Sequence, residues 1–301
     1  MRIFSLLLAI VAGGPAAAET MTLPPADVDL IGAVRIVEAH QDDTLLDIAR
    51  RYDIGQDEIL HANPEVDRWL PGAGTKVVIP SRYVLPHTPR RGLVLNVPEM
   101  RLYYFPPVRR NEHAVIQTYP VSIGRMDWAT PLGETRLVAK VKDPAWHPPD
   151  SIREEAAARG EPLPEFIPSG PDNPLGRFAL RLGLPGYLIH STNKPYGVGM
   201  RVSHGCIRMY PEDIEILFPE VSTETPVRLV NQPAKAGWLA DTLYLEIHPP
   251  LEEDQAGRDA LVDTVMSVVH TAQLQRPVTL SGRAINKAIE EQSGIPVAIS
   301  R

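Results

Sequence analysis

Proline restricts the fold of this chain more than any other residue type does. The sequence of 301 residues contains 31 prolines, about twice the ~5% that is usual in globular proteins. Proline lacks a backbone N–H and fixes φ, so it disrupts helix interiors and central strand positions. We therefore expect strands, turns and extended connections to dominate over helical bundles, and the 44% of apolar residues is sufficient for sizeable cores.

The first 18 residues have the pattern of a secretory signal peptide. Arg2 supplies a positive charge, and residues 3–12 form a largely apolar run that is too short to span a membrane stably. Residues 16–18, Ala-Ala-Ala, provide an A-x-A cleavage site. We expect cleavage after Ala18, which removes 18 of 301 residues and leaves 283. No later stretch reaches eighteen apolar residues, so we expect no membrane anchor.

Charge and cysteine content narrow the possible partners. The net charge is -7 and no basic block is present, which argues against a nucleic-acid partner. It also gives no reason to expect binding to an anionic membrane surface. Cys206 is the single cysteine, so an internal disulfide is impossible. A lone thiol in an oxidising compartment is a liability unless it is buried or used in catalysis, and composition leaves both options open.

Residues 35–80 predict a small β-α-α-β unit. Residues 33–37 are β-prone, and Asp43 and Thr44 can cap a helix that Gly55 would end. A second short helix is expected over 56–62 and a strand over 76–79. We expect a linker at residues 81–91, because this stretch contains two prolines.

A β-rich domain is predicted from 91 to 231, because short apolar segments alternate there with turn residues. A helix should begin at Pro211, and the proline-rich stretch from Trp146 to Pro174 could cover a site as a lid. The remaining residues, 232–301, predict an α/β extension with a strand pair, an amphipathic helix and a last helix that Ser281 caps and that ends near Gly294. Strands are expected at 93–97, 101–105, 114–122, 135–141, 178–182, 187–190 and 227–230.

The residues around Cys206 predict acyl-transfer chemistry. A cysteine reacts as the thiolate, which is a minor species at neutral pH unless a base or a positive environment activates it. His190 and His204 are the two candidate bases, and Gly205 lets backbone N–H groups approach a reacting carbonyl oxygen. Arg208 offers a fork for a carboxylate. A metal site made by the cysteine and the two histidines, or an inert structural thiol, are the alternatives.

Two stretches resemble known families. The run Ser-His-Gly-Cys-Ile-Arg at 203–208, with a histidine upstream at position 190, resembles the signature of the L,D-transpeptidase catalytic domain. Residues 43–52 resemble the D-T-L-x-x-I-A-x-x-Y pattern of LysM modules, which bind the glycan of peptidoglycan or chitin, although Asp42 replaces the usual glycine. Further segments that look like the L,D-transpeptidase family are 130–133, 173–176, 186–190 and 199–202.

The resemblance implies a role for each matching residue. Cys206 matches the nucleophile and His190 the general base, whose ring the backbone carbonyl of Ser191 would orient. His204 matches a supporting histidine, and the N–H groups of Gly205 and Cys206 would form the oxyanion hole. The substrate-binding residues expected from the same match are Arg201, Ser203 and Arg208, and no metal or organic cofactor is implied.

The implied fold is mainly β, with a β-sandwich catalytic domain of the L,D-transpeptidase type, a small βααβ LysM-like domain and a C-terminal α/β extension.

The implied reaction takes place on peptidoglycan in the periplasm: a cysteine thioacyl-enzyme forms on a tetrapeptide stem, D-alanine leaves, and an amine takes the acyl group. The order of domains resembles that of the periplasmic enzymes that anchor an outer-membrane lipoprotein to peptidoglycan, and this resemblance implies the C-terminal lysine of such a lipoprotein as acceptor. The alternatives are 3-3 cross-linking, hydrolysis by water, and a protein that binds peptidoglycan without catalysis.

Overall fold

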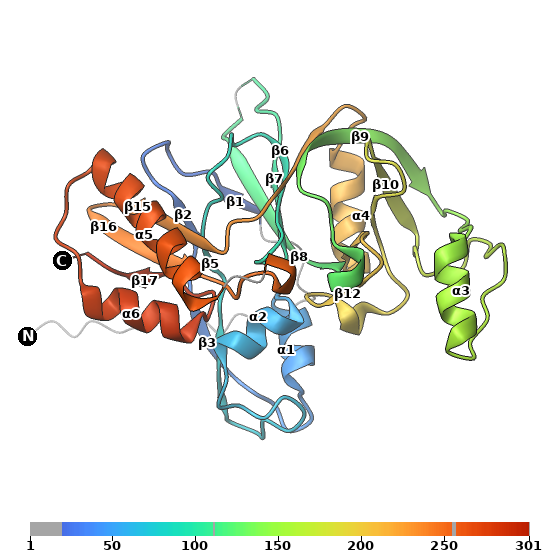
Figure 1. Cartoon of the computed structure of the whole chain (residues 1–301), viewed down its shortest axis with the longest axis horizontal. Coiled ribbons are helices and arrows are strands. Elements are labelled where there is room, and N and C mark those ends of the chain that lie inside the picture. Colours follow the sequence, from blue (N-terminus) through green and yellow to red (C-terminus); the bar gives the residue numbers. More distant parts are fainter. Residues whose placement is uncertain (1–19, 111, 255–256, 301) are drawn as a thin grey trace, which may run out of the picture.

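The computed structural model describes residues 20–110, 112–254 and 257–300, so the expected signal peptide and its cleavage site lie outside the described residues. The fold is mainly β, as predicted, with one large sheet at the centre (Figure 1). In the described part of the chain, no helix is long and apolar enough to cross a membrane.

The central sheet closes on itself and forms a sandwich. Its strands follow the order β1-β8-β13-β11-β10-β9-β14-β6-β7, and β7 also pairs with β8. The long strands β8 and β9 take part in both layers, since each pairs with neighbours on both sides of the sandwich. The strands are β1 (Thr20–Thr22), β6 (Gly92–Asn96), β7 (Arg101–Phe105), β8 (Val115–Gly124), β9 (Gly133–Lys142), β10 (Phe178–Leu182), β11 (Leu188–His190), β13 (Ile207–Met209) and β14 (Pro226–Val230), with β12 (Arg201–Ser203) beside β8.

Apolar side chains from both layers fill the space between them. Leu102, Tyr119 and Leu180 are fully buried there, and α4 (Pro211–Glu220) adds Ile214 and Leu217 to the same core. Pro211 occupies the first turn of α4, where its missing N–H costs no hydrogen bond. This packing fixes the strand ends that carry the candidate site.

The predicted β-α-α-β unit is present at residues 35–80. It consists of β3 (Arg35–Glu38), α1 (Leu45–Arg51), α2 (Gln56–Ala62) and β4 (Lys76–Ile79), with an apolar core of its own. Thr44 caps α1 as expected, and Asp47 completes the capping box. Gly55 does not end α1, which stops at Arg51; instead it is the N-cap of α2.

Residues 81–91 are not a free linker, and that prediction was wrong. β5 (Arg82–Val84) pairs with β2 (Leu30–Gly32), and Tyr83, Val84 and Leu85 are buried. The prolines in this stretch lie beyond the strand, so they do not prevent its pairing.

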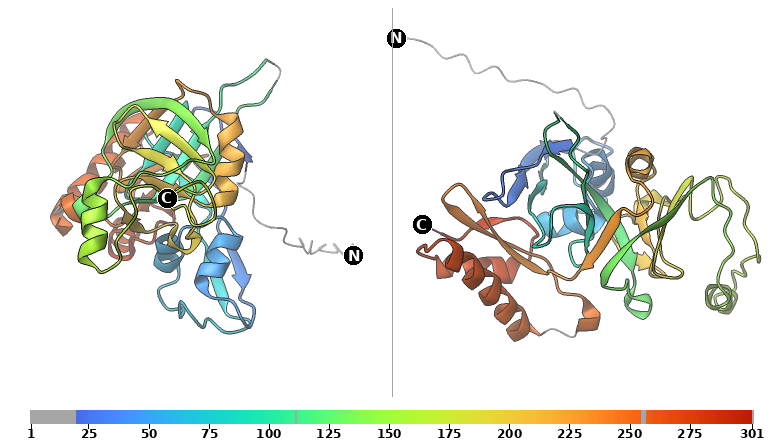
Figure 2. Two further views of the ribbon diagram at one scale, coloured as in Figure 1. Left: turned by 90° about the vertical axis from the view of Figure 1, so that its right-hand side faces the viewer. Right: turned by 90° about the horizontal axis from the view of Figure 1, so that it is seen from above.

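The C-terminal extension packs two helices on a small sheet. The sheet contains β15 (Ala234–Leu239), β16 (Thr242–Ile247) and β17 (Val297–Ala298), and α5 (Arg258–Gln275) and α6 (Gly282–Glu291) share its apolar core. Ser281 caps α6 as predicted. This unit lies at the opposite end of the molecule from α3 (Asp150–Ala158), a helix that the sequence analysis missed (Figures 1 and 2).

The unit at 35–80 is docked on the central sheet through buried charges. Arg101 of β7 is 1% exposed and its guanidinium lies 2.6 Å from the Glu58 carboxylate of α2. The carboxyl groups of Asp53 and Asp213 lie at the same interface, and neither oxygen of Asp213 has a hydrogen-bond partner among the described residues. Two neighbouring buried carboxyl groups are costly to ionise together, so burial and their mutual repulsion favour the protonated form.

Burial raises the pKa of Asp53 to about 6, although the Arg101 charge lowers it. Burial, and then the Asp53 charge, raise the pKa of Asp213 well above its usual range. Because both values are raised relative to the unfolded chain, the pair contributes stability that is complete below about pH 4 and is lost as the pH rises through the folded pKa of about 6.

We expect Asp213→Asn to remove this loss, because an asparagine amide donates to the Asp53 carboxylate without a titrating proton. The difference in the free energy of unfolding, variant minus wild type, should therefore grow in favour of the variant as the pH is raised from 4 to 8. The expected change in this difference is on the order of 1 to 3 kcal/mol. Thermal and denaturant unfolding at several pH values measure it. The control is Glu215→Gln on the exposed face of α4; parallel pH curves for Asp213→Asn and wild type would contradict the prediction.

Candidate active site

Parallel pairing of β11 with β13 brings the two halves of the predicted site together. Ile189 lies opposite Ile207, and His190 lies opposite Arg208. Cys206 immediately precedes β13, at the end of the turn that follows β12. The side chains of His190, Cys206 and Arg208 all line one cavity of about 700 Å³.

Glycine is required at position 205 in this turn. Its φ is +95°, a conformation that side chains other than glycine rarely adopt. A Cβ at this position would lie 2.8 Å from Cε1 of Tyr187 and 3.4 Å from the carbonyl oxygen of Trp128. The turn therefore depends on Gly205 both for its backbone conformation and for space.

Buried hydroxyl groups hold the turn. Thr130 Oγ1 donates to the carbonyl of Gly205 (3.0 Å) and accepts from the N–H of Gly124 (2.9 Å), which ties the turn to the end of β8. The hydroxyl of Ser203 donates to the carbonyl of Cys206. Ser203 was expected to bind substrate, and it also lines the cavity.

His190 is 3% exposed, and its ring makes the expected contact with the backbone of Ser191. Nδ1 lies 2.6 Å from the Ser191 carbonyl oxygen. A carbonyl can only accept, so Nδ1 carries the proton and Nε2 keeps its lone pair. Burial, and then the Arg208 charge, lower the pKa of His190 to about 3, so the imidazole is neutral near pH 7.

The Cys206 thiol is half-buried, with Sγ 3.6 Å from the Gly186 carbonyl oxygen. Burial raises the pKa of this thiol, while a backbone hydrogen bond from Leu188 and the Arg208 charge lower it. A neutral thiol therefore faces the same cavity as a neutral imidazole, and the thiolate–imidazolium pair is not formed in advance.

His204 points toward α3. Its Nε2 lies 2.9 Å from Oε2 of Glu155, and its ring makes an edge contact with Trp128 at 5.3 Å between centroids. Arg125 Nη2 lies 2.7 Å from the same oxygen of Glu155. The Arg125 hydrogen bond, and then that of His204, lower the pKa of Glu155 to about 2, so it is a carboxylate. Glu155 was not found from the sequence, because it is remote from His204 along the chain and belongs to no recognised motif.

The two arginines expected to bind substrate have different positions. Arg208 lines the cavity, and its buried Nε has no hydrogen-bond partner among the described residues. Arg201 does not line this cavity, and its expected contact with substrate stays a prediction. Its guanidinium pairs with Glu253 at 2.6 Å and lines a separate cavity of about 240 Å³. A register shift between Arg201 and Ser203 breaks the side-chain alternation of β12, so the two residues serve different cavities.

Comparisons with known proteins give the family. Residues 90–229 match the model of the YkuD family, described as the L,D-transpeptidase catalytic domain. The Escherichia coli protein named probable L,D-transpeptidase ErfK/SrfK is 38% identical over 94% of this chain and 91% of its own length. Probable L,D-transpeptidase YcfS of the same organism is 36% identical over 100% of this chain and 94% of its own length.

The chain belongs to the L,D-transpeptidase family. It is an enzyme, and its membership is consistent with transpeptidation of peptidoglycan. Among solved structures, the catalytic domain of the Enterococcus faecium L,D-transpeptidase aligns with 48% of this chain and 99% of that chain, at 19% identity and a TM-score of 0.35.

A proline-rich excursion forms one wall of the cavity in this L,D-transpeptidase. It covers residues 143–177 between β9 and β10, and its lining residues include Trp146. α3 lies within this excursion because residues 151–158 are mostly good helix formers that follow Pro149. Other lining residues of the excursion are Ile152, Ala156, Leu163 and Ile167.

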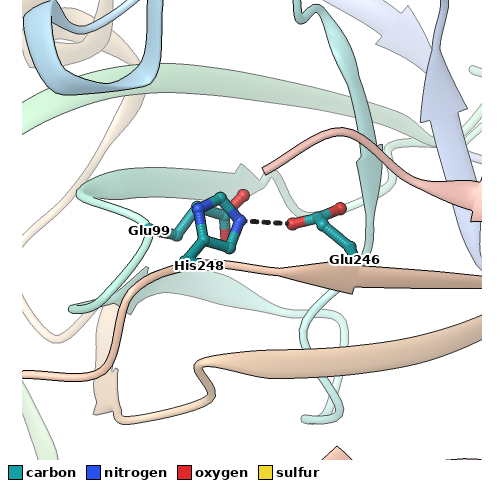
Figure 3. Close-up of side chains that lie close together, drawn as sticks. All are labelled: Glu99, Glu246 and His248. Carbon is teal, nitrogen blue, oxygen red and sulfur yellow. Dashed lines mark hydrogen bonds and ion pairs between the residues drawn. The ribbon is translucent and has the colours of Figure 1, made fainter. Parts of the chain in front are cut away.

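The described residues contain one group with the spacing of metal ligands, and it lies outside the catalytic cavity. Glu99, Glu246 and His248 are buried with ligand atoms within 4.8 Å of one another, and His248 Nε2 is 2.8 Å from a Glu246 oxygen (Figure 3). Lys235 Nζ lies 2.7 Å from an oxygen of each glutamate, so an ammonium group already occupies the space between the carboxylates. The cluster is a buried ion network that joins the C-terminal extension to the β6–β7 turn.

Proposed function

We propose that this L,D-transpeptidase uses Cys206 as its nucleophile and His190 as the base. The observation that carries the proposal is that the Cys206 thiol and the His190 imidazole, whose Nδ1 is held by the Ser191 carbonyl, line one cavity and are both neutral near pH 7. A ring fixed in this way presents Nε2 as the only proton acceptor. The proposed donor is the tetrapeptide stem of peptidoglycan, attacked at the carbonyl of its third residue.

The proton moves in step with bond formation in this mechanism. As Sγ attacks the carbonyl carbon, the thiol proton passes to Nε2 of His190, because the low pKa of the buried imidazole disfavours a preformed ion pair. The N–H groups of Gly205 and Cys206, which donate to no backbone carbonyl of the described residues, receive the developing oxyanion. His190 then protonates the amine of D-alanine as the peptide bond breaks, and the thioacyl enzyme remains.

The second half of the reaction reverses these roles. An acceptor amine attacks the thioester, His190 takes the proton of the amine, and Cys206 leaves as the thiol. The free Nε of Arg208 is suited to a carboxylate of the stem, since a buried guanidinium donor without a partner is costly until a ligand satisfies it. No further co-reactant is needed, because the energy of the peptide bond is retained in the thioester.

The proposed acceptor is the side-chain amine of the C-terminal lysine of an outer-membrane lipoprotein. The cavity wall carries the carboxylates of Glu161 and Asp172 and also the cationic side chains of Arg159, Lys194 and Arg208, so its charge does not select the acceptor and the resemblance in domain order supports the choice. A diaminopimelate amine of a second stem has the same charge, so 3-3 cross-linking is the second candidate. The signal-peptide pattern of the first 18 residues supports a periplasmic location.

The unit at 35–80 is proposed to bind the glycan strand of peptidoglycan. Trp69 and Leu70 lie on its surface with 57% and 80% exposure, and exposed aromatic rings suit the flat faces of sugars. The unit is docked through the ion pair of Glu58 with Arg101, so its deletion would leave the buried Arg101 guanidinium unpaired in the catalytic domain. Point changes on its surface therefore test its role more cleanly than truncation.

We expect Cys206→Ala to abolish the thioacyl enzyme while the fold stays intact, because alanine fits where cysteine packs. His190→Ala should slow acylation by about 10² to 10⁴-fold, and more than His204→Ala does. Intact-protein mass spectrometry with tetrapeptide muropeptides, and with a carbapenem, measures both. A covalent adduct on Cys206→Ala would refute the nucleophile, and an inactive His204→Ala beside an active His190→Ala would reverse the roles of the histidines.

The acceptor is tested by competition. We expect a thioacyl enzyme that is offered a lysine-terminated lipoprotein peptide and a tetrapeptide stem together to form mainly the lipoprotein conjugate. Mass spectrometry of the products gives the ratio. If the stem dimer dominates, the acceptor assignment is wrong while the nucleophile and donor assignments stand.

Trp69→Ala should weaken binding to purified sacculi, because the exposed ring is the main candidate for sugar contact. A loss of roughly 5- to 100-fold is expected for an aromatic hot spot. Turnover of small soluble stems should be unchanged. Leu274→Ala, which removes an apolar side chain of α5 that is more exposed than Trp69, is the control; equal loss in both variants would show that Trp69 has no specific role.

A further inference from the structure

α3 belongs to the long segment between β9 and β10 and contacts the rest of the enzyme at few points. Residues 143–177 leave the sheet after β9 and return at β10, and α3 forms the far edge of this excursion in Figure 1. The neck of the excursion is closed by paired backbone hydrogen bonds between Trp146 and Ile167, each 2.8 Å. The position of α3 relative to the cavity is therefore set by contacts beyond this neck.

Glu155 supplies the polar contact between α3 and the nucleophile loop. One oxygen, Oε2, lies 2.9 Å from His204 Nε2 and 2.7 Å from Arg125 Nη2, while Oε1 accepts from Arg159 of the same excursion at 2.5 Å. Arg125 is itself tied to the loop, because its N–H donates to the Ser203 carbonyl at 3.1 Å. The carboxylate thus connects α3 to His204 and, through Arg125, to Ser203, the residues that lead into Cys206.

Other charged side chains of α3 do not make this connection. Within the described part of the excursion, Arg153 pairs with Asp150 (2.5 Å) and Glu165 (3.4 Å), which are both part of the excursion. Glu154, the neighbour of Glu155, is exposed on the same helix. The link between α3 and the body is therefore concentrated in one carboxylate.

The face of α3 beside this carboxylate is apolar and covers the cavity. Ile152 and Ala156 are one turn apart, both line the cavity, and Ala156 is 2% exposed. A thioester on Cys206 would lie in this cavity and could pass its acyl group either to an amine or to water. Water is present everywhere, so transfer to an amine requires that water be kept from the thioester.

We propose that Glu155 is a positioning residue that latches α3 over the nucleophile cavity and orients His204, and that the latched state favours transfer of the acyl group to an amine over its hydrolysis. The inference rests on the proposed thioacyl function and adds the residue that controls its outcome. A carboxylate at Nε2 also fixes the His204 tautomer with its proton on that nitrogen, which leaves Nδ1 as the basic nitrogen.

The size of the effect follows from partial exposure. The side chains of Glu155, Arg125 and His204 are 25%, 32% and 18% exposed, so water screens the ion pairs in part. Loss of such a contact shifts a closing equilibrium by about fivefold rather than by orders of magnitude. We therefore expect Glu155→Ala to lower the ratio of aminolysis to hydrolysis about fivefold, and Glu155→Gln, which keeps an acceptor of the same length, to lower it less.

The experiment starts from the thioacyl enzyme and measures the partition of the acyl group between an added amine and water. Wild type, Glu155→Ala and Glu155→Gln are compared, and Glu154→Gln is the matched control, which should behave as wild type. A fall in the ratio with an unchanged melting temperature separates positioning from a loss of fold. An unchanged ratio in Glu155→Ala overturns the proposal.

A second measurement keeps the latch testable even if the proposed chemistry fails. Amide hydrogen exchange in α3 should be about fivefold faster in Glu155→Ala than in wild type or Glu154→Gln, because the open state is more populated. Equal exchange in all proteins overturns the latch. A wild-type protein that forms no adduct at Cys206, with α3 still responding to Glu155→Ala, would overturn the thioacyl function and leave the latch standing.

Discussion

The parallel pairing of β11 with β13 is the contact on which the active site depends. It places His190 opposite Arg208, and both residues line the same cavity as Cys206. Both strands are short, so their positions come from their longer neighbours, β8 and β10, and from the core between the layers. A buried site built in this way makes the imidazole and the thiol neutral at rest, because desolvation penalises both charged forms.

Buried charges, rather than apolar surface alone, join the three units of the chain. Arg101 meets Glu58 beneath the unit at 35–80, and Lys235 lies between Glu99 and Glu246 at the C-terminal extension. Such pairs add little net stability over apolar contacts, but breaking one leaves an unpaired charge that is costly to bury. They therefore select one arrangement of the units. The N-terminus of α2 donates to the carbonyls of residues 198 and 199, just before β12, so this arrangement extends to the segment that leads into the nucleophile turn.

Local patterns predicted the local features correctly, and non-local contacts account for the errors. The strand at 178–182, the Ser281 cap and the helix that begins at Pro211 follow from turn chemistry and periodicity. The stretch at 81–91 was read as a linker from its prolines, yet β5 is buried because β2 and the extension cover it. Arg201 was expected to bind substrate from the family resemblance, and the structure places it beside Glu253 in a cavity separate from that of Cys206, which spacing along the chain does not indicate.

By itself, the sequence determined the chemistry that is available: one thiol, two nearby histidines, a glycine before the thiol, and strands instead of bundles. These follow from residue identity and short spacing, which a reader of the chain can inspect directly. The tertiary structure alone decided the electrostatics and the access to the site. Glu155 meets His204, and burial beside Asp53 raises the pKa of Asp213, because the fold brings distant segments together in a low-dielectric interior. The strength of a charge depends on burial and on neighbours in space, and neither can be read from separation along the chain.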